Sequence, residues 1–219
     1  QRLHCGTLDL TLPDGRRVVD WGDGALHLVQ HSVPVRAAMT LRDLQPHLHT
    51  LPEQPTLVPY RTAYYAPAWG FCLRQHDLDA LTAAVGEDGC LDVVIDADLA
   101  PGAMTLGECV VPGATDREIL LSAHACHPAM ANDNASALAV AATLAAAWSE
   151  KPRRHTLRVL FAPGTLGAIA WLHLHRDGLD RIAGGLVLAN LGDGGALTYK
   201  RSRPGTLGPP AAIDRAVAL

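Results

Sequence analysis

One short segment of the chain gathers the residue types that bind metals most readily. Residues 122–134 read Ser-Ala-His-Ala-Cys-His-Pro-Ala-Met-Ala-Asn-Asp-Asn, and they contain His124, Cys126, His127 and Asp133. Two imidazoles and a carboxylate form a nitrogen and oxygen ligand set that suits zinc, although other divalent ions accept the same donors. We therefore predict metal chemistry in this segment.

The elements around this segment predict its place in the fold. Residues 118–123 form a short apolar run that is typical of a buried parallel strand. A long Ala-rich helix is expected next, capped by Asn134 or Ser136. The pattern then predicts a strand, a helix and a strand at residues 156–162, 165–175 and 185–190. This alternation of strands and helices predicts a doubly wound parallel sheet.

Ligands of open α/β sheets bind beyond the carboxyl ends of the strands, so three loops are candidates for the site. The first loop holds the two histidines and Asp133. The second loop is Pro163-Gly164-Thr165, and the third is Asn190-Leu191-Gly192-Asp193-Gly194. A carboxylate from the third loop would converge with the donors of the first. The candidate metal ligands are therefore His127, Asp133, His124 and Asp193.

Each of these residues also has an ordinary structural explanation. His124 alone is equally well explained as a structural histidine, and Asp133 as a helix cap. Asp193 lies in a Gly-Asp-Gly-Gly sequence that is typical of a turn. Cys126 is interpreted as a small buried filler rather than a nucleophile, because the sequence reveals no fixed base beside it. The case for a site depends on the joint position of these residues at adjacent strand ends.

The first half of the chain has a different character. Pro13-Asp14-Gly15 is a turn sequence, and it predicts a hairpin between residues 8–12 and 17–21. Further short strands are expected at 25–29, 32–35, 71–74 and 91–95, and a helical turn at 41–48 capped by Thr40. We predict a β-rich inserted domain over residues 6–110 and an incomplete α/β domain over residues 111–219.

Composition narrows the class of protein. The chain has 219 residues, of which 48% are hydrophobic and 18% charged, with a net charge of −4. These values predict a folded globular protein and argue against a nucleic-acid-binding surface. The sequence has no apolar run long enough for a membrane span and begins with no signal peptide. Its five cysteines form no Cys-x-x-Cys pair, so we expect a reducing, cytoplasmic location.

The loop sequence also resembles a known signature. Residues 126–136 are similar to the Cys-His-Pro-Ser-x-Ala-Asn-Asp-Asn-x-Ser-Gly motif of a bacterial family of aminopeptidase-like proteins, which is related to zinc aminopeptidases and often filed with polysaccharide biosynthesis. The supporting matches are Asp20-Trp21, Leu26-His27, Pro59-Tyr60, Tyr64-Tyr65, Trp69-Gly70-Phe71-Cys72, Gly107-Glu108 and Tyr199-Lys200-Arg201-Ser202-Arg203.

This resemblance implies a fold, a cofactor and residue roles. The implied fold is α/β, with a mostly parallel sheet of the zinc-aminopeptidase type and a small, jelly-roll-like β domain. One or two zinc ions are implied, with His127 as a ligand and Asp133 as the bridging aspartate. His124 matches the strand-end histidine of the wider peptidase group and competes with His127, which we favour. Asp193 is the best candidate for the later carboxylate ligand.

Two departures from the family pattern bear on catalysis. The family has Pro-Glu-Thr-x-Gly where this chain has Pro163-Gly164-Thr165-Leu166-Gly167, so the glutamate that would act as general base is replaced by Gly164. A positioned base contributes roughly 10² to 10⁴ in rate. The family's last metal-binding histidine would also fall beyond Leu219, and the chain would cover about the middle half of the family's length.

These observations support hypotheses of different classes. The first is a zinc-dependent aminopeptidase-like hydrolase that acts on a peptide-like or aminoacyl substrate, with Glu108, Lys200 and Arg203 as candidate substrate-binding residues. The second is a catalytically inactive family member that binds a peptide-like ligand or a partner protein. Redirected chemistry at Cys126 or a histidine is a third and weaker alternative. An exposed sheet edge in a half-length chain would also predict pairing with itself or with a partner chain.

Overall fold

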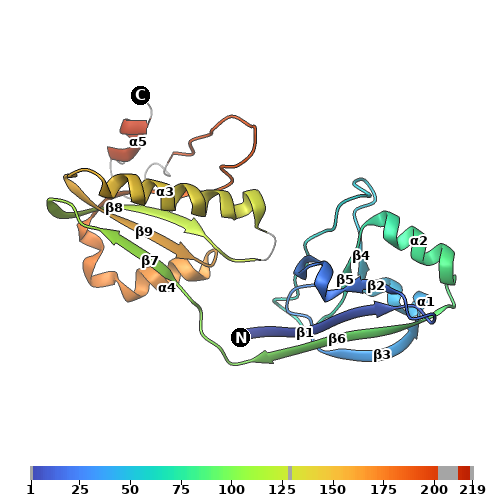
Figure 1. Ribbon diagram of the computed structural model, residues 1–219. Coiled ribbons are helices and arrows are strands. Elements are labelled where there is room, and N and C mark those ends of the chain that lie inside the picture. The colour runs from blue at the N-terminus through green and yellow to red at the C-terminus, as the bar shows by residue number, and fades with distance from the viewer. Residues whose placement is uncertain (1, 128–129, 202–211, 218–219) are drawn as a thin grey trace. The chain divides into compact units, whose positions relative to one another are not determined.

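The computed structural model describes residues 2–127, 130–201 and 212–217 (Figure 1). The chain divides into two compact units, residues 1–103 and 104–219. The sequence placed the boundary after residue 110, and the structure places the strand Gly107–Val111 in the second unit. Within the described residues, no helix combines the length and the apolar character needed to cross a membrane.

The first unit is built on an antiparallel sheet of four strands in the order β2-β1-β6-β3. A short parallel pair, β4 and β5, lies beside helical segments (Figure 1). The strands are β1 Arg2–Thr11, β2 Arg17–Asp20, β3 Val35–Thr40, β4 Leu48–His49, β5 Phe71–Cys72 and β6 Cys90–Ala100. The helical segments are η1 Trp21–Asp23, η2 Ala25–His27, α1 Leu41–Leu44, η3 Gln45–His47 and α2 Gln75–Val85.

The core of this unit follows from alternation along β6. Leu91, Val93 and Ile95 are buried at every second position, as expected for a strand with one face on a core. Leu78 and Leu81 of α2 belong to the same buried cluster. The predicted hairpin is confirmed, since β1 and β2 pair in antiparallel fashion on either side of the predicted turn.

The strands expected at residues 25–29 and 32–35 are wrong, and one helix was missed; β3 begins only at Val35. Residues 25–29 do not form a strand, because residues 25–27 form the 3-10 segment η2, which begins directly after η1 and Gly24. The helix α2 was not predicted at all. Its apolar residues are spaced at 78, 81 and 85, and Gly86 ends it with a positive φ of 67°. The jelly-roll interpretation stays a prediction.

The second unit carries a sheet in the order β10-β8-β9-β7. Its strands are β7 Gly107–Val111, β8 Thr115–His124, β9 His155–Ala162 and β10 Ile182–Leu188. Its helical segments are η4 Ala131–Ser136, α3 Ala137–Ser149, α4 Leu166–Leu174, η5 Arg176–Arg181 and α5 Ala212–Val217. Strand β8 pairs in parallel with β9 and β10, whereas β7 pairs with β9 in antiparallel fashion.

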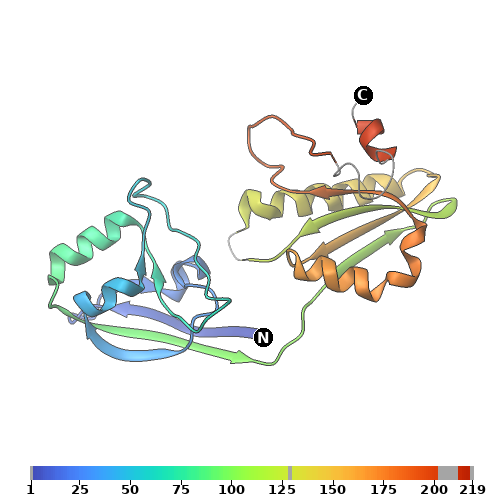
Figure 2. The same cartoon turned by 180° about the vertical axis from the view of Figure 1, so that it is seen from behind.

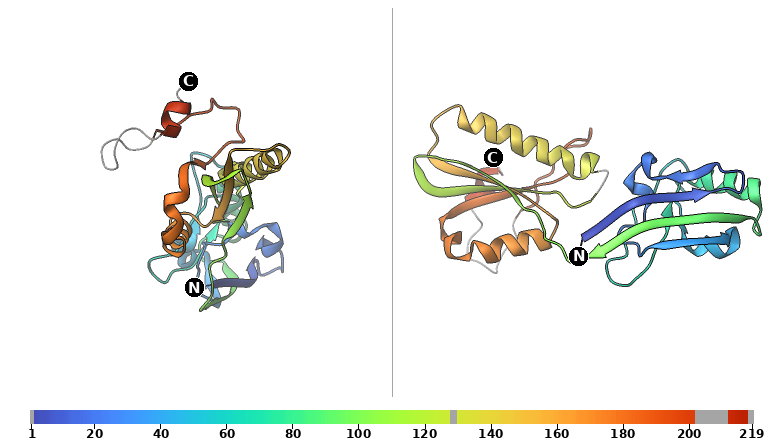
Figure 3. Two further views of the ribbon diagram at one scale, coloured as in Figure 1. Left: turned by 90° about the vertical axis from the view of Figure 1, so that its left-hand side faces the viewer. Right: turned by 60° about the horizontal axis from the view of Figure 1, so that its bottom comes forward.

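The prediction of a mostly parallel sheet is therefore wrong for the chain as a whole. The large sheet of the first unit is antiparallel, since β1 pairs in antiparallel fashion with β2 and β6, and β6 does so with β3. Longer parallel pairing occurs in the second unit, where α3 joins β8 to β9. Figure 2 and the two views of Figure 3 place α3 and α4 on opposite faces of that sheet.

Apolar side chains attach each helix to its face of the second sheet. Ala141 and Ala145 of α3 belong to a buried cluster with Leu157 and Val159 of β9. On the other face, Trp171 of α4 is 3% exposed and clusters with Leu160 and Ala162. The sheet is thus covered on both sides, which leaves its carboxyl edge as the place where loops can form a site.

Candidate functional site

The carboxyl ends of three parallel strands lie in register at one edge of the second sheet. His124, the last residue of β8, pairs with Ala162, the last residue of β9. Leu188 ends β10 and pairs with Ala123. The three loops predicted from the sequence therefore leave the sheet side by side, as parallel strand order requires.

The first loop folds back so that Asp133 meets both histidines. His124 Nε2 lies 2.7 Å from Asp133 Oδ1, and His127 Nε2 lies 3.8 Å from Asp133 Oδ2. This contact argues against the alternative that Asp133 caps the Ala-rich helix, because the Asp133 carboxylate faces the two imidazole rings. Ser136 stands at the start of α3 but makes no side-chain cap, since its hydroxyl donates to Asn132 O at 2.6 Å.

Asn134 holds the first and third loops together. Its side chain is fully buried, and Nδ2 donates to Leu188 O at 3.1 Å and lies 3.3 Å from His124 Nδ1. Its Oδ1 accepts from the backbone amide of Asn190 at 3.0 Å. A donor bond to Nδ1 corresponds to the His124 tautomer that carries its proton on Nε2, the nitrogen that faces Asp133. Asn134 thus fixes the orientation of the His124 ring.

Asn132 brings Asp193 to the same loop cluster. Its Nδ2 donates to Asp193 Oδ2 at 2.8 Å, and its Oδ1 accepts from Gly192 N at 2.7 Å. Asp193 also accepts a hydrogen bond from Gly195 N at 2.8 Å. Such a bond is expected if Gly-Asp-Gly-Gly is an ordinary turn, as the alternative interpretation of this sequence predicts. The sequence reasoning missed Asn132 and Asn134 as positioning residues. The sequence Asn-Asp-Asn could have indicated them, because it places an amide side chain on each side of Asp133.

Cys126 lies elsewhere than predicted. It is exposed rather than a buried filler, because it follows the strand end and leaves the sheet with the loop. Its Sγ lies 3.2 Å from His127 Nδ1. A Cβ added to Gly164 would lie 3.7 Å from the same sulfur. Position 164, where the resemblance implies a general base, therefore faces this loop and offers no carboxylate.

The three predicted substrate-binding residues are not brought together. Glu108 on β7 accepts hydrogen bonds from Arg158 Nη1 at 2.8 Å and from Trp171 Nε1 at 2.9 Å. Burial acts to raise the Glu108 pKa, but these hydrogen bonds and the charge of Arg158 bring the pKa below its usual value. Lys200 is exposed, and Arg203 lies outside the described residues. A substrate role for any of them stays a prediction.

Arg158 is the centre of an ion-pair network that the sequence did not reveal. It pairs with Glu118 on β8 as well as with Glu108, and its side chain is 16% exposed. The Arg158 hydrogen bonds lower the Glu118 pKa, whereas its burial acts to raise it. Strand pairing places Arg158 opposite Leu120, four residues before the strand end at Ala162. We interpret the network as structural support for the sheet.

The donors at the strand ends fit zinc in chemical type but are arranged as a hydrogen-bonded set. Imidazole nitrogens and a carboxylate are ordinary zinc ligands. Within residues 2–127, 130–201 and 212–217, however, no group of three or more His, Cys, Asp or Glu side chains has the geometry to hold a metal ion. The Asp133 carboxylate is directed at His124, and that of Asp193 at Asn132.

The chain is similar in sequence to a known protein. A Clostridium acetobutylicum protein, provisionally named a polysaccharide biosynthesis protein with an aminopeptidase-like domain, is 41% identical over 203 residues. The match covers 93% of this chain and 45% of that protein. The chain therefore spans about half the length of this curated relative.

Solved structures carry the same fold. The crystal structure of a provisional peptidase from Clostridium acetobutylicum superposes with a TM-score of 0.91 at 38% identity, covering all of this chain and 50% of that one. A zinc aminopeptidase from Bacillus subtilis gives a TM-score of 0.56 at 14% identity, over 87% of this chain and 56% of its own. A Shewanella amazonensis peptidase M28 precursor gives 0.51 at 14% identity, over 83% and 57%.

At such low identity the last two likenesses establish the fold alone. The fold is thus similar to the folds of a zinc aminopeptidase and of a peptidase M28 precursor. A family model described as "Domain of unknown function (DUF4910)" matches residues 6–219, nearly the whole chain. The chain belongs to this family.

Proposed function

We propose that the protein is a zinc-dependent aminopeptidase-like hydrolase that acts on a peptide or amide bond. One observation carries the proposal: Asp133 contacts His124 at 2.7 Å and approaches His127 at 3.8 Å, beyond the carboxyl ends of parallel strands. This is the edge at which open α/β sheets bind their ligands. The aminopeptidase-like fold supports the same assignment.

His127, Asp133, His124 and Asp193 are the residues that would hold one or two zinc ions. A bound zinc ion supplies a Lewis acid toward a carbonyl oxygen and lowers the pKa of water toward about 7. The chain's own residues position these donors. Asn134 orients the His124 ring, and Asn132 holds the Asp193 carboxylate beside the first loop.

The substrate would be a peptide-like or aminoacyl compound. Lys200 and Arg203 are suited in charge to a substrate carboxylate. Glu108 is better explained as a partner of Arg158, because it accepts hydrogen bonds from Arg158 of β9 and from Trp171 of α4. The free thiols of Cys72, Cys90, Cys109 and Cys126 support a reducing, cytoplasmic location.

A second function is favoured by Gly164. This position faces Cys126, and its lack of a side chain removes the carboxylate that would accept a proton from water. A protein with the metal donors but without the base would bind a peptide-like ligand or a partner protein and turn over slowly or not at all. Both proposed functions require bound metal, but only the hydrolase would cleave its ligand at an appreciable rate.

Metal content and hydrolysis, measured together on the full chain, test the proposal. Elemental analysis after zinc loading should find zinc in the wild type and a clear loss in His127→Ala and Asp133→Asn. His173→Ala is the matched control, because His173 is an exposed histidine of α4 outside the loops. Aminoacyl-p-nitroanilides report hydrolysis, and an N-acyl amino sugar is added because the Clostridium relative's name refers to polysaccharide biosynthesis.

The outcomes separate the two functions. Zinc binding with turnover that disappears in His127→Ala supports the hydrolase. Zinc binding without turnover of any substrate supports the binding protein. A wild type that retains no zinc, or that loses as much zinc in His173→Ala as in His127→Ala, contradicts both.

A further inference from the structure

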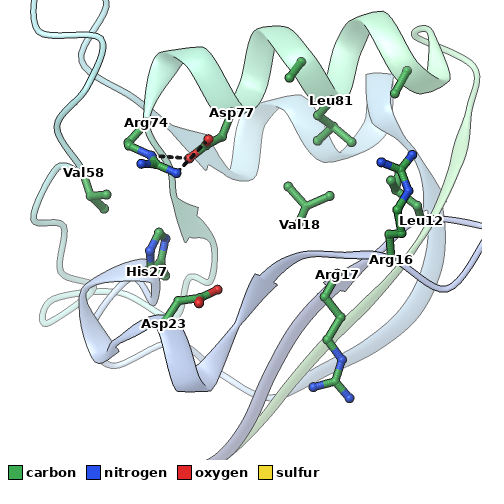
Figure 4. A pocket seen from close by; sticks show the side chains of 12 residues that line it. Leu12, Arg16, Arg17, Val18, Asp23, His27, Val58, Arg74, Asp77 and Leu81 are labelled. Atoms are coloured by element: carbon green, nitrogen blue, oxygen red, sulfur yellow. Dashed lines mark hydrogen bonds and ion pairs between the residues drawn. The ribbon is translucent and has the colours of Figure 1, made fainter.

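A groove lies in the first unit, remote in sequence from the loops that carry the candidate metal site. It occupies about 530 Å³ between α2 and the hairpin of β1 and β2, and η1, η2 and Val58 complete its wall. Figure 4 shows the side chains that line it. This volume lies within the range of about 300 to 1,000 Å³ that is usual for small-molecule sites.

The floor of the groove is apolar. Leu12, Val18 and Leu81 form it, and Leu12 and Leu81 are 7% and 3% exposed. Ala80 and Ala84 line it one helical turn apart on α2. Because alanine is short, this face of α2 does not fill the space above Val18. The floor can therefore receive the carbon face of a ligand.

One end of the groove is polar and holds both kinds of hydrogen-bonding group. His27 Nδ1 donates to Cys72 O at 2.8 Å, so Nε2 is the acceptor in the tautomer that carries its proton on Nδ1. Arg74 uses Nε and Nη2 on the two oxygens of Asp77, at 2.7 and 3.1 Å, and a guanidinium retains further N–H donors. The described residues give the Asp23 carboxylate one long hydrogen bond, 3.3 Å from Asp20 N.

The charges around the groove nearly balance. Asp23 and Asp77 face the single guanidinium of Arg74, and the positive N-terminal end of α2 offsets part of the remaining charge. The two other arginines of the lining are paired with carboxylates of the hairpin region: Arg16 lies 2.8 Å from Asp14, and Arg17 pairs with Asp20. A strongly charged ligand would therefore gain little here, whereas hydroxyl groups can donate to Asp23 and His27 and accept from Arg74.

From these features we infer that the groove is a binding site for an uncharged, hydroxyl-rich ring, namely a pyranose sugar unit. The carbon face of the ring would lie on Val18 and the alanines of α2, and its hydroxyls would meet the polar end. All the residues that line the groove belong to the first unit, so sugar binding can be tested independently of zinc binding and hydrolysis.

Binding is tested by titrating the isotope-labelled full chain and following its amide signals by two-dimensional NMR. The probes are the methyl pyranosides of glucose, galactose, mannose and N-acetylglucosamine. Glucuronate carries a charge on the same kind of ring, and cyclohexanol offers a carbon ring with one hydroxyl. We expect saturable shifts in β2, η2 and α2 with at least one neutral pyranoside, and weaker binding of glucuronate and cyclohexanol.

Variants place the ligand in the groove. Asp23→Asn should weaken binding roughly fivefold, the effect of losing one charge-assisted hydrogen bond in a half-open site. Ala84→Leu should abolish saturable binding by filling the floor. Their matched controls are Asp79→Asn and Ala83→Leu, which make the same changes on α2 outside the groove and should bind like the wild type.

Three results would overturn the inference. No neutral pyranoside of the panel gives saturable shifts; or Asp23→Asn and Ala84→Leu bind as tightly as their controls; or glucuronate or cyclohexanol binds at least as tightly as the best neutral pyranoside. The amide spectra of the free variants show whether each is folded, so a misfolded protein is not mistaken for lost binding.

Discussion

Gly164 and Cys126 face one another across two loops: a Cβ added to Gly164 would lie 3.7 Å from Cys126 Sγ and 3.9 Å from Cys126 Cβ. Both distances are ordinary van der Waals contacts. A Cβ at position 164 therefore fits without moving the loop, and it would lie beside the residue that precedes His127. A carboxylate can therefore be introduced by mutation at the position where the resemblance implies a general base.

Gly164→Glu should create or raise hydrolytic activity. If the donors hold zinc, a carboxylate at this position is expected to raise kcat by about 10² or more, because proton transfer from water gains a positioned acceptor. Aminoacyl-p-nitroanilide hydrolysis measures the effect. Gly164→Gln is the control, since it has nearly the same shape without the basic carboxylate. Equal activity of the Glu and Gln variants would contradict the assignment of this loop.

Alkylation should distinguish the cysteines by exposure and report zinc binding. Iodoacetamide is expected to modify Cys90, Cys109 and Cys126, which are exposed, and to spare Cys72 in the folded protein. Burial raises the pKa of Cys72 to about 11, so little thiolate forms there near neutral pH. Mass spectrometry of tryptic peptides measures each rate.

Zinc should slow alkylation of Cys126 alone, because its sulfur lies 3.2 Å from His127 Nδ1. Cys90 and Cys109 serve as internal controls in the same sample. Equal slowing at all three cysteines would indicate an effect of zinc on the reagent or on the whole protein, and no slowing at Cys126 would argue against zinc at His127.

Asn134→Asp should destabilise the strand edge by about 3 kcal/mol. The change removes the buried donors that reach Leu188 O and His124, and it places a carboxylate against those acceptors. Hydrogen exchange of the last amides of β8 and β10 measures the local loss. Asn132→Asp is a solvent-accessible contrast with an expected cost below about 1 kcal/mol. Similar exchange in the two variants would show that burial of Asn134 is unimportant.

The Arg158 network should make the second unit sensitive to acid. The folded-state pKa of Glu118 is lowered by its hydrogen bonds to Arg158, so this group stabilises the fold above its unfolded pKa near 4.5. That stabilisation is lost as the pH falls through the lower folded value. At pH 7, Glu118→Gln should cost roughly 2 kcal/mol in the free energy of opening β8 and β9, since it leaves Arg158 partly unpaired.

Hydrogen exchange of β8 and β9 amides at pH 7 and pH 3 checks this prediction. The difference between Glu118→Gln and the wild type should shrink at the lower pH. Asp116→Asn is the control, because Asp116 is exposed on the same strand. A difference that is unchanged at pH 3 would mean that Glu118 acts through packing and not through its charge.

The sequence by itself determined the parallel strands of the second unit and the loops between them. Apolar runs at 118–123 and 156–162, separated by an Ala-rich helix, encode β8, α3 and β9 with little ambiguity, because each run is buried on both faces. The same local reasoning gave the hairpin at Pro13-Asp14-Gly15 and the cap of α1 by Thr40, whose hydroxyl accepts from Asp43 N. These features depend on residues that are close in the sequence.

Only the tertiary structure decided how the side chains meet. Asp133 contacts His124, and Asn134 donates to Leu188 O, 54 residues along the chain, through hydrogen bonds that no local pattern encodes. The exposure of Cys126, the partners of Arg158 and the groove beside α2 likewise depend on which elements pack together. Local periodicity specifies the strands and helices, whereas the site is set by long-range contacts between loops that the strand order brings to one edge of the sheet.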